Sequence, residues 1–247
     1  MLAFLKGKNT RTVKQSKPSE LEMVTHPASR ISEQYRTLRA NIQFSSVDNV
    51  LKTFVVTSAE SGAGKSTIAS NLALSFVSQG MKVLLIDADM RKPVIHNLFK
   101  LTNRDGLTTL LSTKGLDEDR VIHKIGSSNL SVLTCGPVPP NPSELMASQR
   151  MQQLMDDLKK RFDLIIVDVP PIIAVADAQI MANMADGTIF VIRKGISTKD
   201  SVMKAKELLE MSKATIIGSV FNGTVENEDM NSSYYGVEKK GHHDSFY

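Results

Sequence analysis

Cysteine, tryptophan and aromatic side chains are scarce in this chain of 247 residues, and each shortage excludes something. Cys135 is the single cysteine, so no internal disulfide bond can form. Tryptophan is absent and aromatic residues make up 5%, which argues against a surface that stacks the bases of single-stranded nucleic acid. The net charge of +4 is too small to imply a nucleic acid partner by itself. We therefore expect no nucleic acid ligand.

Long apolar runs are missing as well. No apolar stretch approaches the roughly 18 residues that cross a bilayer, and the apolar stretch at the N-terminus is too short for a secretory signal. Together with the lone cysteine, these absences predict a cytoplasmic protein. Hydrophobic residues still make up 41% of the chain and charged residues 23%, which suits one α/β domain with a sizeable core.

Three parts follow one another along the chain. Residues 1–28 are polar and basic, with five Lys or Arg residues, and we expect a flexible arm there that is either solvated or in contact with anionic lipid or a partner. Residues 29–222 carry the periodic pattern of a folded domain. Residues 223–247 lack periodicity and are mostly polar, which predicts a flexible tail.

Strand and helix patterns alternate within residues 29–222. An amphipathic helix is expected first, over residues 31–46. Short apolar runs typical of buried strands lie at 53–59, 82–87, 130–136, 162–168, 187–193 and 214–221. Helical patterns lie at 65–79, 143–160, 176–185 and 198–211, with a less regular helix-rich stretch at 94–125. This alternation predicts an α/β fold with a mostly parallel sheet covered by helices on both faces.

A phosphate-binding loop follows the first expected strand. Residues 59–67, AESGAGKST, match the pattern G-x-x-x-x-G-K-[ST] except that Ala59 replaces the first glycine. The glycines let backbone N–H groups face phosphate oxygens, and the following helix adds its positive N-terminal dipole. Lys65 would bridge the β- and γ-phosphates of ATP, and Ser66 would bind Mg²⁺. The expected nucleotide-binding residues of this P-loop NTPase are Ser61, Gly62, Ala63, Gly64, Lys65, Ser66 and Thr67.

Three carboxylates stand where expected strands end, at the edge where such sheets bind ligands. Asp168 could hold Mg²⁺ there, although a helix or turn cap is the alternative. Asp87 and Asp89 lie on one side of an extended segment, so they could serve as metal ligand and proton acceptor. Arg91 follows, either to stabilise phosphoryl charge, to contact a neighbour, or as solvated surface charge. Asn222 ends the last expected strand, where its amide could pair with adenine or form a turn.

Five segments resemble motifs of the bacterial tyrosine kinases and occur in that family's order. SEQYRTLRANIQFSS resembles the N-terminal helix with its E-x-x-R-x-x-R motif, and TSAESGAGKST resembles the phosphate loop. LLIDADMRKP resembles the second Walker box, GPVPPNPSELMAS a segment before the Walker B box, and LIIVDVPP that box itself. The resemblance covers about residues 30–222. It implies an ATP-dependent protein-tyrosine kinase of capsule and exopolysaccharide production, on a P-loop fold unlike that of eukaryotic kinases.

By that resemblance, Lys65, Ser66, Asp87, Asp89 and Asp168 are the nucleotide, metal and catalytic positions. Ser66, Asp87 and Asp168 are the expected Mg²⁺ ligands. Asp87 is the residue expected to orient or deprotonate the tyrosine hydroxyl, with Asp89 as the alternative. A largely dissociative transition state needs positioning more than a strong base, so a carboxylate suffices.

The resemblance also implies surfaces for assembly and modification. Glu33, Arg36 and Arg39 share roughly one helical face, which in the family packs on the neighbouring subunit of a ring, although a local ion pair is the alternative. The expected autophosphorylation sites in the tail are Tyr234, Tyr235 and Tyr247. Implied partners are the cytoplasmic tail of a transmembrane activator, which recruits the chain to the inner face of the membrane, a protein-tyrosine phosphatase and other protein substrates.

Two other functions compete with the kinase. Positioning ATPases of the Min and plasmid-partition type share the fold and the strand-end aspartates, but they resemble each other in an extra lysine where this chain has Glu60. A scaffold that binds ATP without turnover is the other candidate. Transfer of labelled phosphate to tyrosine separates the three.

Overall fold

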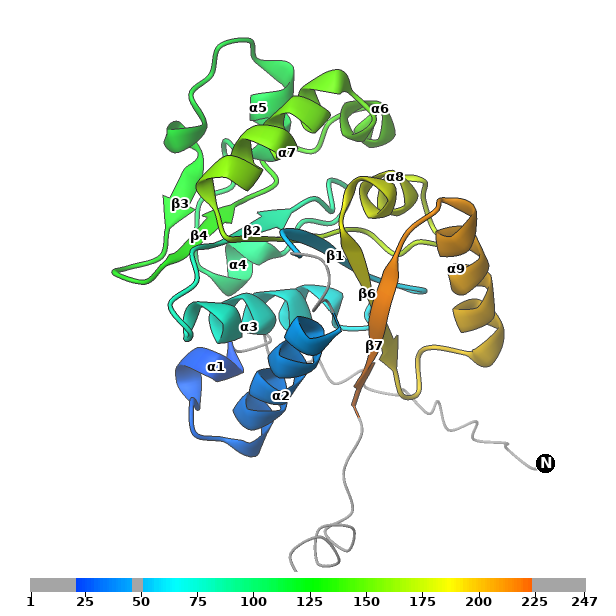
Figure 1. Ribbon diagram of the computed structural model, residues 1–247. Helices are drawn as coiled ribbons and strands as arrows, with labels where there is room; N and C mark the ends of the chain where they lie inside the picture. The colour runs from blue at the N-terminus through cyan, green and yellow to red at the C-terminus, as the bar shows by residue number, and fades with distance from the viewer. Residues whose placement is uncertain (1–20, 46–50, 224–247) are drawn as a thin grey trace, which may run out of the picture.

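A seven-stranded sheet forms the centre of the computed structural model, which describes residues 21–45 and 51–223 (Figure 1). The strands are β1 (Thr53–Ser58), β2 (Val83–Asp87), β3 (Ile122–Lys124), β4 (Leu130–Leu133), β5 (Leu164–Asp168), β6 (Gly187–Arg193) and β7 (Ile216–Asn222). They lie in the order β3-β4-β2-β5-β1-β6-β7. Neighbouring strands are parallel except β3 and β4, which are antiparallel. The predicted mostly parallel sheet is confirmed.

Helices cover both faces of this sheet (Figure 1). They are α1 (Glu22–Thr25), α2 (Arg30–Phe44), α3 (Lys65–Val77), α4 (Ile95–Leu98), α5 (Leu107–Ser112), the 3₁₀ turn η1 (Glu118–Arg120), α6 (Pro142–Met146), α7 (Gln149–Arg161), α8 (Asp177–Met184) and α9 (Lys199–Met211). Residues of α2, α3 and α4 join the core on one face, and residues of α5 to α9 join the core on the other. The P-loop architecture that the sequence predicts is therefore present.

Side chains that alternate along the strands explain why both faces are packed. Phe54 and Val56 of β1 belong to the core beneath α3, whereas Val55 between them belongs to the opposite core. All six residues of β1 are buried, as is typical of a central strand in a parallel sheet.

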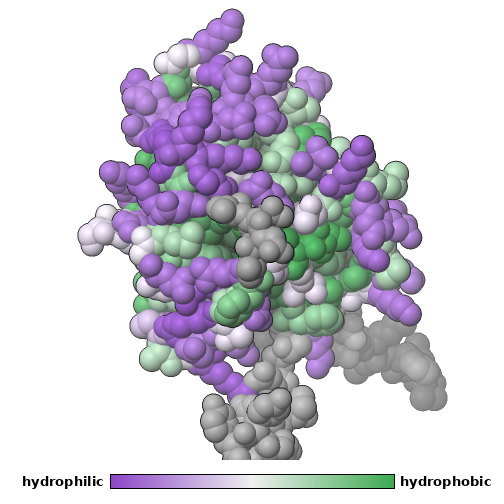
Figure 2. Space-filling model, in the orientation of Figure 1, coloured by the Kyte–Doolittle hydropathy of each residue, from purple (hydrophilic) through white to green (hydrophobic). Residues whose placement is uncertain are grey.

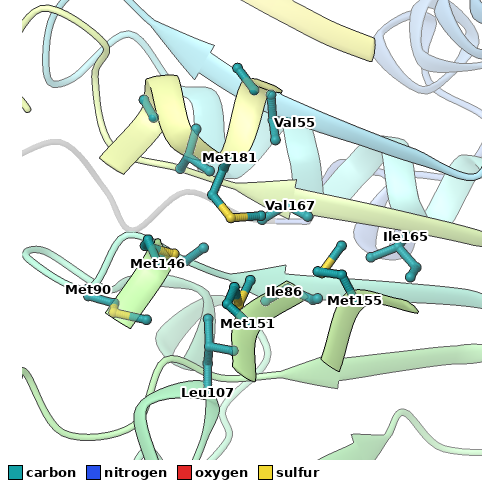
Figure 3. Close-up of a cluster of buried hydrophobic side chains, with 14 of the residues drawn as sticks. Val55, Ile86, Met90, Leu107, Met146, Met151, Met155, Ile165, Val167 and Met181 are labelled. Atoms are coloured by element: carbon teal, nitrogen blue, oxygen red, sulfur yellow. The ribbon is translucent and has the colours of Figure 1, made fainter. Parts of the chain in front are cut away.

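Methionines fill much of the core beneath α6, α7 and α8 (Figure 3). The group comprises Met90, Met146, Met151, Met155 and Met181. Their unbranched side chains adapt to the irregular spaces where short helices meet the sheet. Met90 is fully buried and follows β2 by three positions, so this core also holds the start of a loop at the edge of the sheet.

The strand ends place the candidate site. β2 and β5 are neighbours, and their register sets Asp87 directly opposite Asp168. β1 lies beside β5 and leads into the loop that precedes α3. Because the carboxyl ends of parallel strands meet at one edge, the predicted loop and carboxylates converge there.

Three local features differ from the expectation. Residues 22–25 form the short helix α1, and the backbone N–H of Met23 donates to Asn71 of α3, so ordered structure begins before residue 29. The expected helix 143–160 is divided, because Ser148 caps a new helix by accepting a hydrogen bond from the N–H of Met151. β3 is a short, partly polar strand inside the stretch expected to be helix-rich.

Polar and apolar residues gather on different parts of the face shown in Figure 2. Figure 2 shows hydrophilic residues over the region of α5 and α7 and hydrophobic residues near β7. β7 is an edge strand, and its Phe221 side chain is 63% exposed. Within the described part of the chain, every helix is too short or too polar to cross a bilayer.

Candidate active site

The phosphate-binding loop connects β1 to α3, as predicted. Gly62 and Gly64 have φ angles of +83° and +90°, which side chains of L residues rarely adopt. A Cβ atom on Gly64 would lie 2.3 Å from Nδ2 of Asn222, so any larger residue there would displace the Asn222 side chain. α3 begins at Lys65, and its first N–H groups and positive dipole end therefore adjoin the loop. This arrangement is that of an anion-binding site.

Two side chains from neighbouring strand ends fix the loop. Nη1 of Arg193, the last residue of β6, donates to the carbonyl oxygen of Gly62 at 2.7 Å. Nδ2 of Asn222, the last residue of β7, donates to the carbonyl oxygen of Ala63 at 2.8 Å. Asn222 was expected near the base, and Arg193 was not singled out. The one available signal for Arg193 was its place at the end of an expected strand.

A groove of about 600 Å³ lies beside Asn222, between α2 and β7. Tyr35, Ile68 and Phe221 contribute ring and aliphatic surface to it. A groove of this volume and lining suits a flat aromatic group such as a nucleotide base.

Lys65 lies at the centre of the carboxylates. Its Nζ is 2.9 Å from Oδ2 of Asp89 and 3.3 Å from Oδ1 of Asp168, and its side chain is 10% exposed. Burial lowers the pKa of Lys65, but the negative charges of Asp168 and Asp89 outweigh this effect, so its pKa is raised. The ammonium group therefore stays protonated and compensates two buried carboxylates.

Asp168 is fully buried at the end of β5 and contacts Ser66, another residue that the sequence predicts to bind Mg²⁺. Oγ of Ser66 donates to Oδ2 of Asp168 at 2.5 Å. Burial raises the pKa of Asp168, whereas Lys65 and Ser66 oppose that shift. Asp168 and Ser66 come from different stretches of the chain, and the loop and β5 bring them together as predicted.

Asp87 is fully buried beside Asp168 and organises the loop that follows it. Its carboxylate accepts hydrogen bonds from the backbone N–H groups of Asp89, Val94 and Ile95, at 3.3, 3.1 and 2.9 Å. Burial, with the charge of Asp168, raises the pKa of Asp87 to about 7. A carboxyl group with that pKa can exchange a proton near neutral pH.

The oxygen atoms at this edge fit Mg²⁺ bound together with a nucleotide. Within residues 21–45 and 51–223, no three His, Cys, Asp or Glu side chains form a complete metal site. Mg²⁺ usually takes one or two carboxylates and completes its shell with phosphate oxygens and water. Asp168 and Ser66 supply such a partial set.

A second ion pair lies on the same edge and was not predicted. Arg91 Nε is 3.0 Å from Oδ2 of Asp177, which is the first residue of α8 and is fully buried. Ser143 of α6 also donates to Oδ1 of Asp177. Arg91 is therefore held within the chain and is not simply solvated. Nothing in the sequence around Asp177 marks it as a partner of Arg91, because the two are 86 positions apart.

The face proposed for subunit contacts is partly engaged within the chain. Glu33 and Arg36 form an ion pair at 2.7 Å on the surface of α2. Arg39 Nη1 donates to the carbonyl oxygen of Ser75 and to Oγ of Ser78, near the end of α3. Tyr234, Tyr235 and Tyr247 lie outside the described residues.

The fold and the loop define a P-loop nucleotide-binding protein of the ParA type, a fold that binds nucleoside triphosphates, typically with Mg²⁺. The sequence matches the profile of the ParA family, described as NUBPL iron-transfer P-loop NTPase, over residues 49–244. The cell division ATPase MinD of Pyrococcus furiosus shares this fold, with a TM-score of 0.58 at 23% identity, covering 69% of this chain and 71% of MinD.

More similar proteins narrow the family. Tyrosine-protein kinase YwqD of Bacillus subtilis is 47% identical over 87% of this chain and 90% of its own length. Putative tyrosine-protein kinase CapB of Staphylococcus aureus is 41% identical over 90% of this chain and 96% of its own length. The kinase domain of Escherichia coli tyrosine kinase ETK superposes with a TM-score of 0.80 at 34% identity, covering 89% of this chain and 86% of that domain. The chain belongs to the bacterial tyrosine-protein kinase family.

Proposed function

We propose that this chain is an ATP- and Mg²⁺-dependent protein-tyrosine kinase that phosphorylates the tyrosines of its own tail and regulates capsule or exopolysaccharide synthesis. The observation that carries the proposal is the buried cluster of Lys65 with Asp87, Asp89 and Asp168 beside the phosphate loop. Kinase relatives at 41% and 47% identity support tyrosine as the acceptor.

The loop and its neighbours bind the nucleotide. Backbone N–H groups from Ser61 to Thr67 face the phosphates, and the groove beside Asn222 receives the base. Ser66 and Asp168, with Asp87 beside them, hold Mg²⁺, which supplies positive charge to the phosphate oxygens when bound. Lys65 exchanges its contact with Asp89 for phosphate oxygens, because a triphosphate brings more negative charge than one carboxylate.

Asp87 orients the acceptor and receives its proton. The phenolic oxygen of tyrosine forms a bond to the γ-phosphorus, and the bond to the oxygen that bridges the β- and γ-phosphates breaks, so that ADP leaves. The phenolic proton passes to the carboxylate of Asp87, which need not be a strong base because the transition state is largely dissociative. Asp89 is the second candidate for this role, since it also lies at this edge.

The acceptors that we propose are Tyr234, Tyr235 and Tyr247. β7 ends at Asn222, which binds the phosphate loop, so the tail leaves the fold next to the site. About 12 residues of coil, the separation between Asn222 and Tyr234, span roughly 20 Å. That distance lets the tail approach its own site or that of a neighbouring chain.

The assembly that we propose is a homo-oligomeric ring that docks on the cytoplasmic tail of a membrane activator. A protein-tyrosine phosphatase removes the phosphate groups from the tail. Glu33 and Arg36 offer charge on the exposed side of α2 for subunit contacts, and Arg39 completes that face. The activator would recruit the chain to the inner face of the membrane, where other protein substrates become accessible.

Transfer of labelled γ-phosphate tests the function. Wild-type chain with Mg·ATP is expected to yield phosphotyrosine, and Lys65→Met is expected to yield none. The assay runs with and without a peptide of a candidate activator tail, because the family resemblance implies that the soluble chain alone is weakly active. Free phosphate without phosphotyrosine would identify a positioning ATPase, and binding without turnover would identify a scaffold.

Replacement of Asp87 tests its role within that reaction. Asp87→Asn keeps the hydrogen bonds to Val94 and Ile95 through its carbonyl oxygen but cannot accept the proton. We expect nucleotide affinity within about threefold of wild type and transfer reduced by roughly 100-fold or more, as for loss of a general base. Transfer near the wild-type rate would exclude Asp87 from catalysis.

A further inference from the structure

Asp177 is a fully buried carboxylate that the nucleotide site does not use. A buried charge is costly unless it is paired and hydrogen-bonded, so its partners indicate its role. Oδ2 of Asp177 is 3.0 Å from Nε of Arg91, and Oδ1 is 3.4 Å from Nη2 of the same guanidinium. Ser143 Oγ donates to Oδ1 as well. We call Arg91, Ser143 and Asp177 the clasp.

The clasp joins three elements that are separate in the sequence. Arg91 belongs to the loop after β2, Ser143 to α6 and Asp177 to α8. Nη2 of Arg91 is also 3.4 Å from Oγ of Ser143, so the guanidinium contacts both helices. The guanidinium is planar and forked, and two of its nitrogens contact one carboxylate, which fixes orientation as well as distance.

The position of Arg91 makes this contact relevant to catalysis. Arg91 follows Asp89 by two residues. Met90 lies between them and is fully buried in the methionine-rich core (Figure 3). Among the described residues, the Asp89 carboxylate accepts two hydrogen bonds: Oδ1 accepts the N–H of Lys92 at 3.0 Å, and Oδ2 accepts from Nζ of Lys65 at 2.9 Å. If Lys65 binds phosphate as proposed above, the contact of Lys65 with Asp89 is lost.

We propose that Asp177 is a positioning residue that acts through Arg91 to keep the loop of Asp87 and Asp89 in place once a nucleotide draws Lys65 away. This inference rests on the proposed kinase function. The phosphate loop is held by other residues, Arg193 and Asn222, so the clasp governs the catalytic step and not nucleotide binding.

Kinetics of Asp177→Asn provide the first test. We expect kcat for phosphotransfer to fall roughly tenfold or more while KM for ATP stays within about twofold, because misplaced catalytic groups slow the chemical step. Ser143→Ala removes one hydrogen bond and gives a smaller fall of the same kind. Arg161→Gln is the matched control: Arg161 is 38% exposed against 41% for Arg91, and it pairs with Glu118 and Asp119 far along the chain from the site.

A double variant separates positioning from general stability. If the two residues act as one unit, Arg91→Gln with Asp177→Asn lowers kcat no further than the more affected single variant. Independent effects would multiply. All rates are measured well below the melting temperature of each variant.

Amide hydrogen exchange gives a readout that needs no phosphotransfer. The N–H groups of Lys92, Val94 and Ile95 are bonded to the carboxylates of Asp89 and Asp87. In Asp177→Asn with ATP and Mg²⁺ bound, we expect peptides containing them to exchange about tenfold faster, with no change in Arg161→Gln. If wild type transfers no phosphate to tyrosine, the kinase assignment is overturned. The hydrogen-exchange rates would still show whether the clasp holds the loop in place. Unchanged exchange, or equal changes in kcat and KM, overturns the inference.

Discussion

At the scale of single residues, the site combines backbone geometry with compensated charge. Gly64 gives the loop its left-handed turn, and Lys65 sets one positive charge between the carboxylates of Asp89 and Asp168. Neither feature is useful without the other, because the loop binds phosphate only if the ammonium group is free to leave its carboxylates. Gly64→Ala tests the backbone geometry of the loop, and Asp87→Asn tests the charge of the site.

Gly64→Ala tests the close approach of the loop to β7. The added Cβ would lie 2.3 Å from Nδ2 of Asn222, so Asn222 must move and lose its bond to Ala63. Gly80→Ala is a matched control, since Gly80 has φ of +87° and nothing within 4 Å of an added Cβ. We expect Gly80→Ala to cost about 1–2 kcal/mol of stability and leave ATP affinity unchanged. Gly64→Ala should cost more and weaken ATP binding at least ~10-fold; equal ATP affinities in calorimetric titration would contradict this.

The raised pKa of Asp87 predicts that the stability of the fold depends on pH. Its pKa is raised from 3.8 to about 7, so the folded chain keeps a proton that the unfolded chain releases. That proton stabilises the fold at low pH, and the stabilisation is lost as pH rises toward 7. Between pH ~5 and ~7 in EDTA, we expect wild type to lose roughly 1.4 kcal/mol per pH unit relative to Asp87→Asn.

Urea unfolding at several pH values measures this difference. Asp105→Asn, at an exposed aspartate, makes the same change of charge and serves as the control. Stability curves of wild type and Asp87→Asn that stay parallel across this pH range would show that the Asp87 carboxyl is not the group responsible.

At the scale of elements, aspartates act at both ends of the strands. At the edge opposite the site, Oδ2 of Asp186 accepts from the N–H groups of Lys52 and Thr53 and from Oγ1 of Thr53. Asp163 similarly accepts the N–H of Lys82 where β2 begins. Carboxylates at the starts of strands therefore fasten the sheet, whereas those at the C-terminal edge form the site.

Removal of Asp186 tests this division. Asp186→Ala leaves the start of β1 without three hydrogen bonds to one charged acceptor, and we expect a loss of about 2–3 kcal/mol in unfolding free energy. Asp157→Ala removes one exposed ion pair with Lys160 and should change it by less than about 0.5 kcal/mol. Urea denaturation measures both. Nucleotide affinity should not change in either variant, and a loss of affinity in Asp186→Ala would argue against separate roles for the two edges.

At the scale of the whole molecule, the mostly parallel sheet with helices on both faces and the position of the phosphate loop could be predicted from the sequence. Continuous apolar runs identified the central strands, and the pattern around Lys65 located the loop, because both signals are local. The break at Ser148, the strand β3 and the partners of Arg91 and Gly62 could not be predicted. Asp177 and Arg193 meet Arg91 and Gly62 only after folding, and their sequence neighbours carry no distinctive pattern. The cap at Ser148 is local, because Ser148 accepts the N–H of Met151 three positions on, but a serine alone does not distinguish a cap from a position within a helix.

The central claim is that Mg²⁺ and the nucleotide bind together at the edge where Lys65, Ser66 and Asp168 meet. Calorimetric titration of ATP with and without Mg²⁺, for wild type and Asp168→Asn, tests it most directly. We predict that Mg²⁺ raises the affinity of wild type for ATP at least ~10-fold and that Asp168→Asn loses this increase. Equal wild-type affinities with and without Mg²⁺, or a full Mg²⁺ effect in Asp168→Asn, would contradict the account.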